Sequence, residues 1–184
     1  MSKPLKILIL EDRKTDLALV KRQVQKVAAN AIFTIATNGS EFIERINWGV
    51  PDIILSDYNL PDYNGVEALL LAKEKMPHVP FVFITGMLNS EEEVATAILQ
   101  GASGYILKDN LKTIPDRLPA ILEAAKERQE AEEHKRMLAR KTTILLQKME
   151  AILQKSSDFE GKKEIVATLA EIRGHSSKKK SKNA

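Results

Sequence analysis

Cysteine is absent from this 184-residue chain, which excludes disulfide bonds, a thiolate nucleophile and a zinc-thiolate site. Long apolar runs are missing as well, since no stretch approaches the roughly 20 residues that a membrane-spanning helix needs. The chain runs from Met1 directly into a short strand-like segment, without the charged and apolar pattern of a signal peptide. We therefore expect a soluble, cytoplasmic protein.

Glycine and proline are missing from residues 120–155. A single helix of about 35 residues is therefore expected there, starting near the prolines at 115–119, which a first helical turn tolerates. A heptad reading gives two positions along one stripe of this helix, occupied by Ile121, Arg128, Lys135, Thr142 and Met149 and by Ala124, Ala131, Leu138, Leu145 and Ile152. Because Arg128 and Lys135 interrupt the apolar stripe, two interpretations remain: a dimer-forming coiled coil, or a charged helix that docks only at its ends.

Charge is unevenly distributed along the chain, whose net charge is +3. Residues 1–119 hold 13 Lys and Arg against 15 Asp and Glu, a net of −2, whereas residues 120–184 hold 15 against 10, a net of +5. A basic extension suits an acidic partner or nucleic acid, but solvated helix faces usually carry such charge.

Five apolar segments of strand length alternate with helix-like patterns in the first two thirds of the chain. The segments are residues 7–10, 31–36, 53–55, 81–84 and 105–107. Most are continuously apolar, which indicates strands that are covered on both faces. The alternation predicts an α/β fold with a doubly wound, five-stranded parallel sheet.

Helix boundaries follow from capping and breaking residues. Thr15 is placed to cap the first helix, and Pro77 stops the third. The fourth helix begins with the capping-box spacing of residues 90–93 and ends at Gly101. Gly174 is expected to end a short amphipathic helix near the end of the chain.

These boundaries divide the chain into four parts. We expect the α/β domain at residues 1–125, a helical extension at 126–155, the short helix at 156–174 and a disordered, lysine-rich tail at 175–184.

Acidic residues follow two of the predicted strands. Glu11 and Asp12 end the first apolar run, and Asp57 ends the third. Ligands bind at the carboxyl ends of strands in parallel α/β sheets, and carboxylates brought together there repel each other unless they share a cation or a proton. Because Mg²⁺ prefers oxygen ligands and is often held by one or two carboxylates with water and phosphate, the sequence predicts a magnesium-phosphate site around Asp57.

The order of the polar residues resembles that of a CheY-like response-regulator receiver domain. The matching residues, spread over about residues 5–125, are Glu11-Asp12, Ser56-Asp57-Tyr58-Asn59-Leu60-Pro61 with Gly65, Ile84-Thr85-Gly86 and Gly104-Tyr105-Ile106-Leu107-Lys108. Four separate strand ends each supply the residue that the family has there. The resemblance implies a flavodoxin-like fold and a phosphoacceptor that takes a phosphoryl group from the phosphohistidine of a sensor histidine kinase or a phosphotransfer protein.

The resemblance also implies the ligands of the ion and the acceptor of the phosphoryl group. Asp57 is the phosphoacceptor, whose carboxylate attacks phosphorus to form an acyl phosphate. The side chains of Asp12 and Asp57 hold Mg²⁺ together with the main-chain carbonyl of Asn59, and Glu11 reaches the ion through water. We expect slow self-dephosphorylation at most and therefore no enzyme.

Three further residues complete the expected switch. Lys108 neutralises charge on the phosphoryl oxygens, and the Thr85 hydroxyl hydrogen-bonds one of them. Tyr105 is the aromatic residue that rotates inward when Thr85 moves toward the phosphoryl group. Taken singly, each residue has an ordinary structural explanation, such as packing for Tyr105 or a solvated strand end for Lys108. Those explanations do not account for a whole set of polar residues at strand carboxyl ends.

Two features depart from the family or stay open. Asp109 follows Lys108 where many receivers have proline, so the geometry of that loop is not fixed by a proline ring. Trp48 serves either as a partner contact or as a packing residue between a helix and a loop.

The output is expected to be protein-protein interaction, because residues 126–184 show no helix-turn-helix pattern and leave no room for an enzymatic domain. The protein is then a phosphorelay shuttle, or a homodimer that pairs through the long helix. The alternative is a nucleic-acid-binding regulator that uses the basic extension. A dehalogenase-like phosphatase is disfavoured because position 59, where such enzymes have a general acid, is Asn59.

Overall fold

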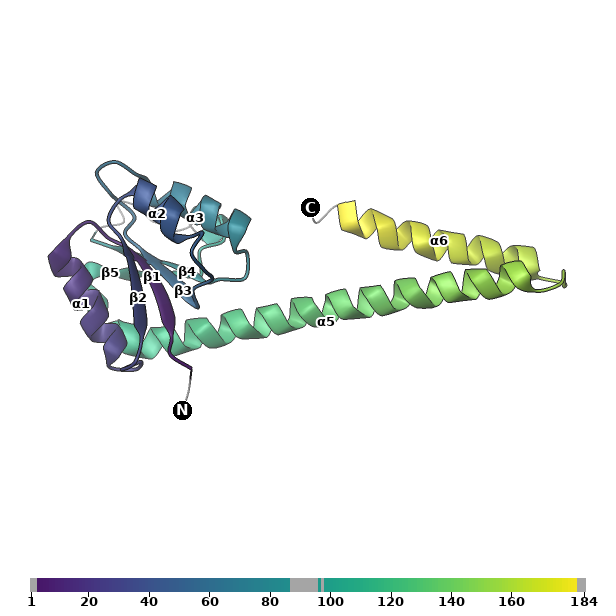
Figure 1. Cartoon of the computed structure of the whole chain (residues 1–184), viewed down its shortest axis with the longest axis horizontal. Helices are drawn as coiled ribbons and strands as arrows, with labels where there is room; N and C mark the ends of the chain where they lie inside the picture. Colours follow the sequence, from purple (N-terminus) through teal and green to yellow (C-terminus); the bar gives the residue numbers. More distant parts are fainter. Residues whose placement is uncertain (1–2, 87–95, 97, 182–184) are drawn as a thin grey trace. The chain divides into compact units, whose positions relative to one another are not determined.

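The computed structural model describes residues 3–86, 96 and 98–181, and their side chains as far as residue 172 (Figure 1). The predicted capping box at residues 90–93 lies outside this part of the chain. Ile98 and Leu99, from the predicted fourth helix, are helical, and Gly101 follows with a φ of +99°. That left-handed conformation is the usual way for glycine to end a helix.

One parallel sheet forms the centre of the first part of the chain. Its strands are β1 (Lys6–Leu10), β2 (Ile32–Ala36), β3 (Ile53–Ser56), β4 (Phe81–Thr85) and β5 (Gly104–Leu107). They lie in the order β2-β1-β3-β4-β5, and every neighbouring pair is parallel. This confirms the predicted doubly wound fold, and each strand lies within one residue of its predicted bounds.

Helices cover both faces of the sheet. Their bounds are α1 (Lys14–Gln25), α2 (Gly39–Arg45), α3 (Gly65–Lys75), a 3₁₀ segment η1 (Lys108–Thr113) and α5 (Ile114–Lys155). Leu8 and Leu10 of β1 pack in the core with α2 and α3, whereas Ile7 and Ile9 pack in a second core with α1 and the start of α5. The alternation follows the two-residue period of a strand and explains why residues 7–10 of β1 are all apolar.

The N-cap of α1 differs from the prediction. The helix begins at Lys14 with Arg13 as N-cap and no side-chain cap, so Thr15 lies inside the first turn. The Arg13 N–H donates to Glu11 Oε1 at 3.1 Å. This hydrogen bond lies in the turn between β1 and α1. In α2 and α3, by contrast, Asn38 and Asn64 accept from the backbone N–H groups of Glu41 and Val66.

The chain divides into two compact units after Arg128. α5 spans 42 residues and crosses this division, as the sequence predicts for a helix that continues to residue 155. The second unit contains the rest of α5 and α6 (Lys162–Ser181). In this unit Leu146 and Leu169 are buried, whereas Leu138, Leu145 and Ile152 of the heptad stripe are exposed. Leu146, the buried residue in the part of α5 that belongs to the second unit, is one position away from the predicted stripe.

α6 continues through Gly174 to Ser181, whereas the sequence predicts an end at Gly174 and a disordered tail from residue 175. Glycine inside a helix costs about 1 kcal/mol relative to alanine. It ends a helix when it takes the left-handed conformation at the C′ position. Among the described residues, the glycines with positive φ are Gly101 and Gly161. Gly174 is therefore accommodated as an interior helical residue.

Two further observations concern the surface. Trp48 is 64% exposed, and the Arg45 guanidinium lies 3.7 Å from the centre of its ring. In the part of the chain that the structure describes, no helix combines the length and apolar character required to cross a bilayer.

Candidate functional site

Three carboxylates meet at the carboxyl ends of β1 and β3. Glu11, Asp12 and Asp57 each place an oxygen within 4.8 Å of the other two. The pairing of Leu10 with Ser56 causes this proximity, because the residues that follow these partners leave the sheet side by side. The Asp57 N–H also donates to the Leu10 carbonyl at 2.8 Å. Glu11 and Asp57 are buried, and Asp12 is half-buried.

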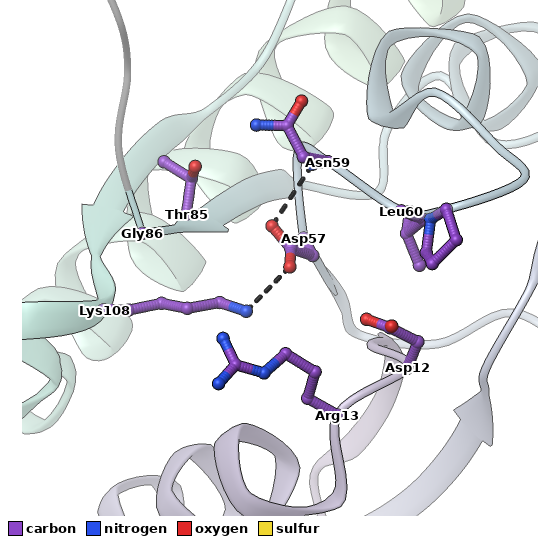
Figure 2. Close-up of a pocket in the computed structure, with 9 residues that line it drawn as sticks. Asp12, Arg13, Asp57, Asn59, Leu60, Thr85, Gly86 and Lys108 are labelled. Atoms are coloured by element: carbon purple, nitrogen blue, oxygen red, sulfur yellow. Dashed lines mark hydrogen bonds and ion pairs between the residues drawn. The ribbon is translucent and has the colours of Figure 1, made fainter.

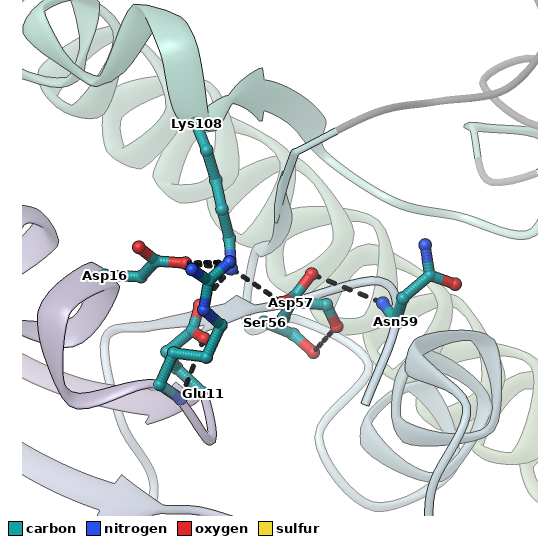
Figure 3. Close-up of polar contacts among 7 residues, drawn as sticks. Glu11, Asp16, Ser56, Asp57, Asn59 and Lys108 are labelled. Carbon is teal, nitrogen blue, oxygen red and sulfur yellow. Dashed lines mark hydrogen bonds and ion pairs between the residues drawn. The ribbon is translucent and has the colours of Figure 1, made fainter. Parts of the chain in front are cut away.

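Lys108, which follows β5, reaches across the sheet edge to this cluster (Figure 3). Its Nζ lies 2.7 Å from Glu11 Oε2 and 2.7 Å from Asp57 Oδ2. A third carboxylate oxygen, Asp16 Oδ2 from the first turn of α1, lies 2.8 Å away. An ammonium group has three N–H donors, so three carboxylates use its whole hydrogen-bonding capacity.

Burial and charge act in opposite directions at this site. Burial raises the pKa of Glu11, with a further rise from the Asp57 charge and an opposing hydrogen bond from Lys108. The hydrogen bond from Lys108 lowers the pKa of Asp16. For Lys108, burial lowers the pKa, but the hydrogen bonds to Asp16, Asp57 and Glu11 outweigh it and the pKa is raised overall. Lys108 is therefore a permanently charged cation at neutral pH.

A cavity of about 420 Å³ opens beside Asp57 (Figure 2). Its lining includes residues from four strand ends, namely Asp12, Arg13, Asp57, Asn59, Leu60, Pro61, Thr85, Gly86 and Lys108. The Asn59 N–H donates to Asp57 Oδ1 at 3.3 Å, and Thr85 is buried at the end of β4. The structure thus brings Asp12, Asp57, Asn59, Thr85 and Lys108 to one cavity.

Tyr105 lies apart from the residues that line the cavity. It is half-buried on β5, where its carbonyl accepts a hydrogen bond of 2.7 Å from Arg117 Nη1 of α5. The Arg117 guanidinium also lies 5.8 Å from the centre of the Tyr105 ring. The aromatic residue is therefore connected to the long helix.

Gly65 allows the start of α3 to approach the backbone of the Asp57 loop. A Cβ atom at this position would lie 2.7 Å from the Asp57 carbonyl oxygen and 2.9 Å from Tyr58 Cα. The Gly65 N–H donates to the Tyr58 carbonyl at 3.0 Å, and Asn59 and Asn64 form an isolated bridge across the same loop. Gly86 is different, because a Cβ there meets no described atom within 4 Å.

Sequence reasoning missed Asp16 and Arg13. Arg13 lines the cavity, and its Nη1 lies 3.5 Å from Asp16 Oδ2. Asp16 lies in the first turn of α1, soon after the acidic pair Glu11-Asp12, and this closeness along the chain is the one sequence signal that points to it. Its contact with Lys108 spans 92 residues, so the sequence gives no direct indication of that pairing.

Comparisons with known proteins agree with this architecture. Residues 7–119 match the model of the response regulator receiver domain. Over 122 residues the chain is 35% identical to the nitrate/nitrite response regulator protein NarL of Escherichia coli K12, covering 66% of this chain and 55% of that relative. The chain thus spans about half the length of this relative.

Solved structures show the same fold. A CheY-like receiver domain protein from Methanospirillum hungatei superimposes with a TM-score of 0.61 at 24% identity, covering 68% of this chain and 99% of that one. The Mn²⁺-bound form of response regulator Rcp1 superimposes with a TM-score of 0.53 at 26% identity, covering 61% and 91% respectively.

Proposed function

Since this chain belongs to the response regulator receiver family of two-component systems, we propose that Asp57 accepts a phosphoryl group from a phosphohistidine. The donor is a sensor histidine kinase or a phosphotransfer protein. An Asp57 carboxylate oxygen bonds to phosphorus while the bond from phosphorus to the imidazole nitrogen breaks. The electron pair of that bond stays with the departing imidazole.

The observation that carries this proposal is the position of Asp57. Its carboxylate lines a cavity, accepts a hydrogen bond from Lys108 Nζ at 2.7 Å, and lies in a cluster of three acids. A nucleophile next to a permanent cation suits transfer of a phosphoryl group, whose oxygens carry negative charge in the transition state. The buried Thr85 borders the same cavity, and we propose that its hydroxyl hydrogen-bonds a phosphoryl oxygen.

The cluster also fits a divalent ion. We propose that Asp12, Asp57 and the main-chain carbonyl of Asn59 hold Mg²⁺, because hard oxygen ligands at this separation suit it. Glu11 uses Oε2 for Lys108 and Oε1 for the Arg13 N–H, which supports contact through water rather than direct ligation. When bound, the ion supplies positive charge to the phosphoryl oxygens. The Mn²⁺-bound form of the similar Rcp1 supports a metal site in this fold.

The output is proposed to be a change in protein-protein contacts. Tyr105 acts as the switch, and its contacts with Arg117 give a route from the phosphorylation site to α5. The second half of α5 exposes large apolar residues, namely Met137, Leu138, Ile144, Leu145, Met149 and Ile152. These exposed apolar residues support a homodimer that pairs through the long helix. The alternative output is a monomeric phosphorelay shuttle. We do not propose nucleic-acid binding, because among the described residues only the basic charge of the extension is compatible with it, and solvated helix faces usually carry such charge.

The test is modification of the full-length protein by acetyl phosphate with Mg²⁺, measured by intact mass. The wild type is expected to gain one phosphoryl group, and Asp57→Asn is expected to gain none because an amide cannot attack phosphorus. The control is Asp62→Asn, which removes an exposed acid from the same loop and should behave as the wild type. Equal modification of the wild type and Asp57→Asn would contradict the proposal that Asp57 is the phosphoacceptor.

A further inference from the structure

Lys108 donates to two carboxylates besides Asp57, and only one of them belongs to the acidic cluster. Glu11 is a member of that cluster. Asp16 comes from α1, and its side chain is 14% exposed. Neither the metal site nor the nucleophile requires an acid at this position. The structure nevertheless places Asp16 Oδ2 at 2.8 Å from the ammonium, nearly as close as Asp57 Oδ2 at 2.7 Å.

We propose that Asp16 is a positioning residue for phosphoryl transfer, which together with Glu11 orients the Lys108 ammonium so that its third N–H points at Asp57. This inference rests on the proposed function of Asp57. It adds a role to a residue outside the family motif described above.

The geometry of an ammonium group supports this role. Its three N–H bonds diverge tetrahedrally, so two fixed hydrogen bonds determine the direction of the third. Glu11 and Asp16 provide those two at 2.7 and 2.8 Å. When Asp57 carries a phosphoryl group, a phosphoryl oxygen replaces Asp57 Oδ2 as the third acceptor, and the other two bonds persist.

The length of the lysine side chain makes such support necessary. Four methylene groups separate the ammonium from the backbone, and a lysine on a flexible stem behaves as a mobile point charge. With Asp16 removed, Glu11 is the one carboxylate besides Asp57 that still orients the ammonium, so its direction toward Asp57 is less fixed. Arg13 Nη1 lies 3.5 Å from the same oxygen, Asp16 Oδ2, but the Arg13 side chain is mostly exposed and its contact adds little.

The experiment is a double-mutant cycle in the full-length protein, with the rate of phosphorylation by acetyl phosphate measured at saturating Mg²⁺. Asp16→Ala is expected to slow the reaction about tenfold, less than the roughly hundredfold that a 1 Å misplacement of a reacting group can cost, because Glu11 still holds the ammonium. Asp16→Asn keeps an oxygen that accepts the Lys108 N–H and should recover part of the rate. In a Lys108→Ala background, Asp16→Ala should have no further effect, because Asp16 acts only through Lys108.

Asp62→Asn serves as the control for loss of an acidic charge and should leave the rate unchanged. Thermal unfolding of each variant shows whether it folds. If Asp16→Ala does not fold, the phosphorylation rate of Asp16→Asn tests the inference in its place. A wild-type rate or a faster one in Asp16→Ala would overturn the inference, since Asp16 would then be irrelevant or a competitor for Lys108. An equal slowing in the Lys108→Ala background would also overturn it. If the wild type itself gains no phosphoryl group, the proposed function fails and this inference fails with it.

Discussion

At the scale of single residues, the site holds more negative than positive charge. Glu11, Asp12, Asp16 and Asp57 carry a formal charge of −4, and Lys108 and Arg13 together contribute +2. Lys108 contacts three of these acids. Asp12 is therefore the acid of this group that Lys108 does not contact, and it is also a proposed metal ligand.

Replacing Asp12 tests both roles at once. Without Mg²⁺, Asp12→Asn should raise the free energy of unfolding by about 0.5 kcal/mol, the usual scale of a pair of charges near a surface. Saturating Mg²⁺ should stabilise the wild type by about 2.7 kcal/mol at a hundred times its Kd, because the ion binds only the folded state. The variant should lose most of that gain. Thermal unfolding in EDTA and in Mg²⁺ measures both effects, and a Mg²⁺-dependent gain equal to that of the wild type would contradict the assignment.

The sequence predicts the residues at strand ends better than those on helices. Glu11, Asp57 and Lys108 were expected to come together because parallel strands end at one edge of the sheet, and they do. Asp16 was missed because its role depends on how α1 packs beside η1, which no local pattern encodes. The roles of Thr85, Asn59 and Tyr105 stay predictions, since contact geometry alone does not assign them.

At the scale of elements, the start of α3 fixes the loop that carries Asp57. A Cβ on Gly65 would meet backbone atoms at 2.7 and 2.9 Å, and backbone cannot rotate away as a side chain can. Gly65→Ala is therefore expected to destabilise the protein by about 1 to 3 kcal/mol, as for overpacked sites. It should also slow phosphorylation of Asp57, because the loop has to shift.

Gly49→Ala provides the matched control for this substitution. Gly49 has no positive φ, and a Cβ there meets no described atom within 4 Å, so alanine should be tolerated. Chemical unfolding and the acetyl phosphate reaction compare the two variants. Equal stability of Gly65→Ala and Gly49→Ala would show that the loop yields without cost.

The elements themselves were predictable to different degrees. Continuous apolar runs located all five strands, because a strand that is buried on both faces is apolar at nearly every position. The boundaries of α1 and α6 were less accurate. α1 begins at Lys14 without the side-chain cap that was expected from Thr15, and Gly174 lies inside α6 because glycine only weakens a helix.

At the scale of the whole molecule, the second unit is the candidate output. The exposed stripe of α5 predicts that beryllofluoride with Mg²⁺ changes the mass of the full-length protein in light scattering. Residues 1–128, which form the first unit and contain the family match, should show no such change. A change in both would place the interface in the first unit, and no change in either would favour a monomeric shuttle.

Leu138→Asp and Leu145→Asp refine this test. Both residues are at least half exposed, so an aspartate should not disturb the fold of the single chain. A charge in a helix pair costs association energy, and these variants should stay monomeric while Asp57 is still phosphorylated. Unchanged association would exclude this stripe as the interface.

The division of the chain at Arg128 has a spectroscopic consequence. The single tryptophan, Trp48, and the three tyrosines, Tyr58, Tyr63 and Tyr105, all lie in the first unit, and the second contains one aromatic residue, Phe159. Intrinsic fluorescence excited at the indole and phenol bands therefore reports on the first unit alone. Far-ultraviolet circular dichroism also records the helices of the second unit. Comparing the two signals during one melt would show, without any added label, whether the units unfold together or one after the other.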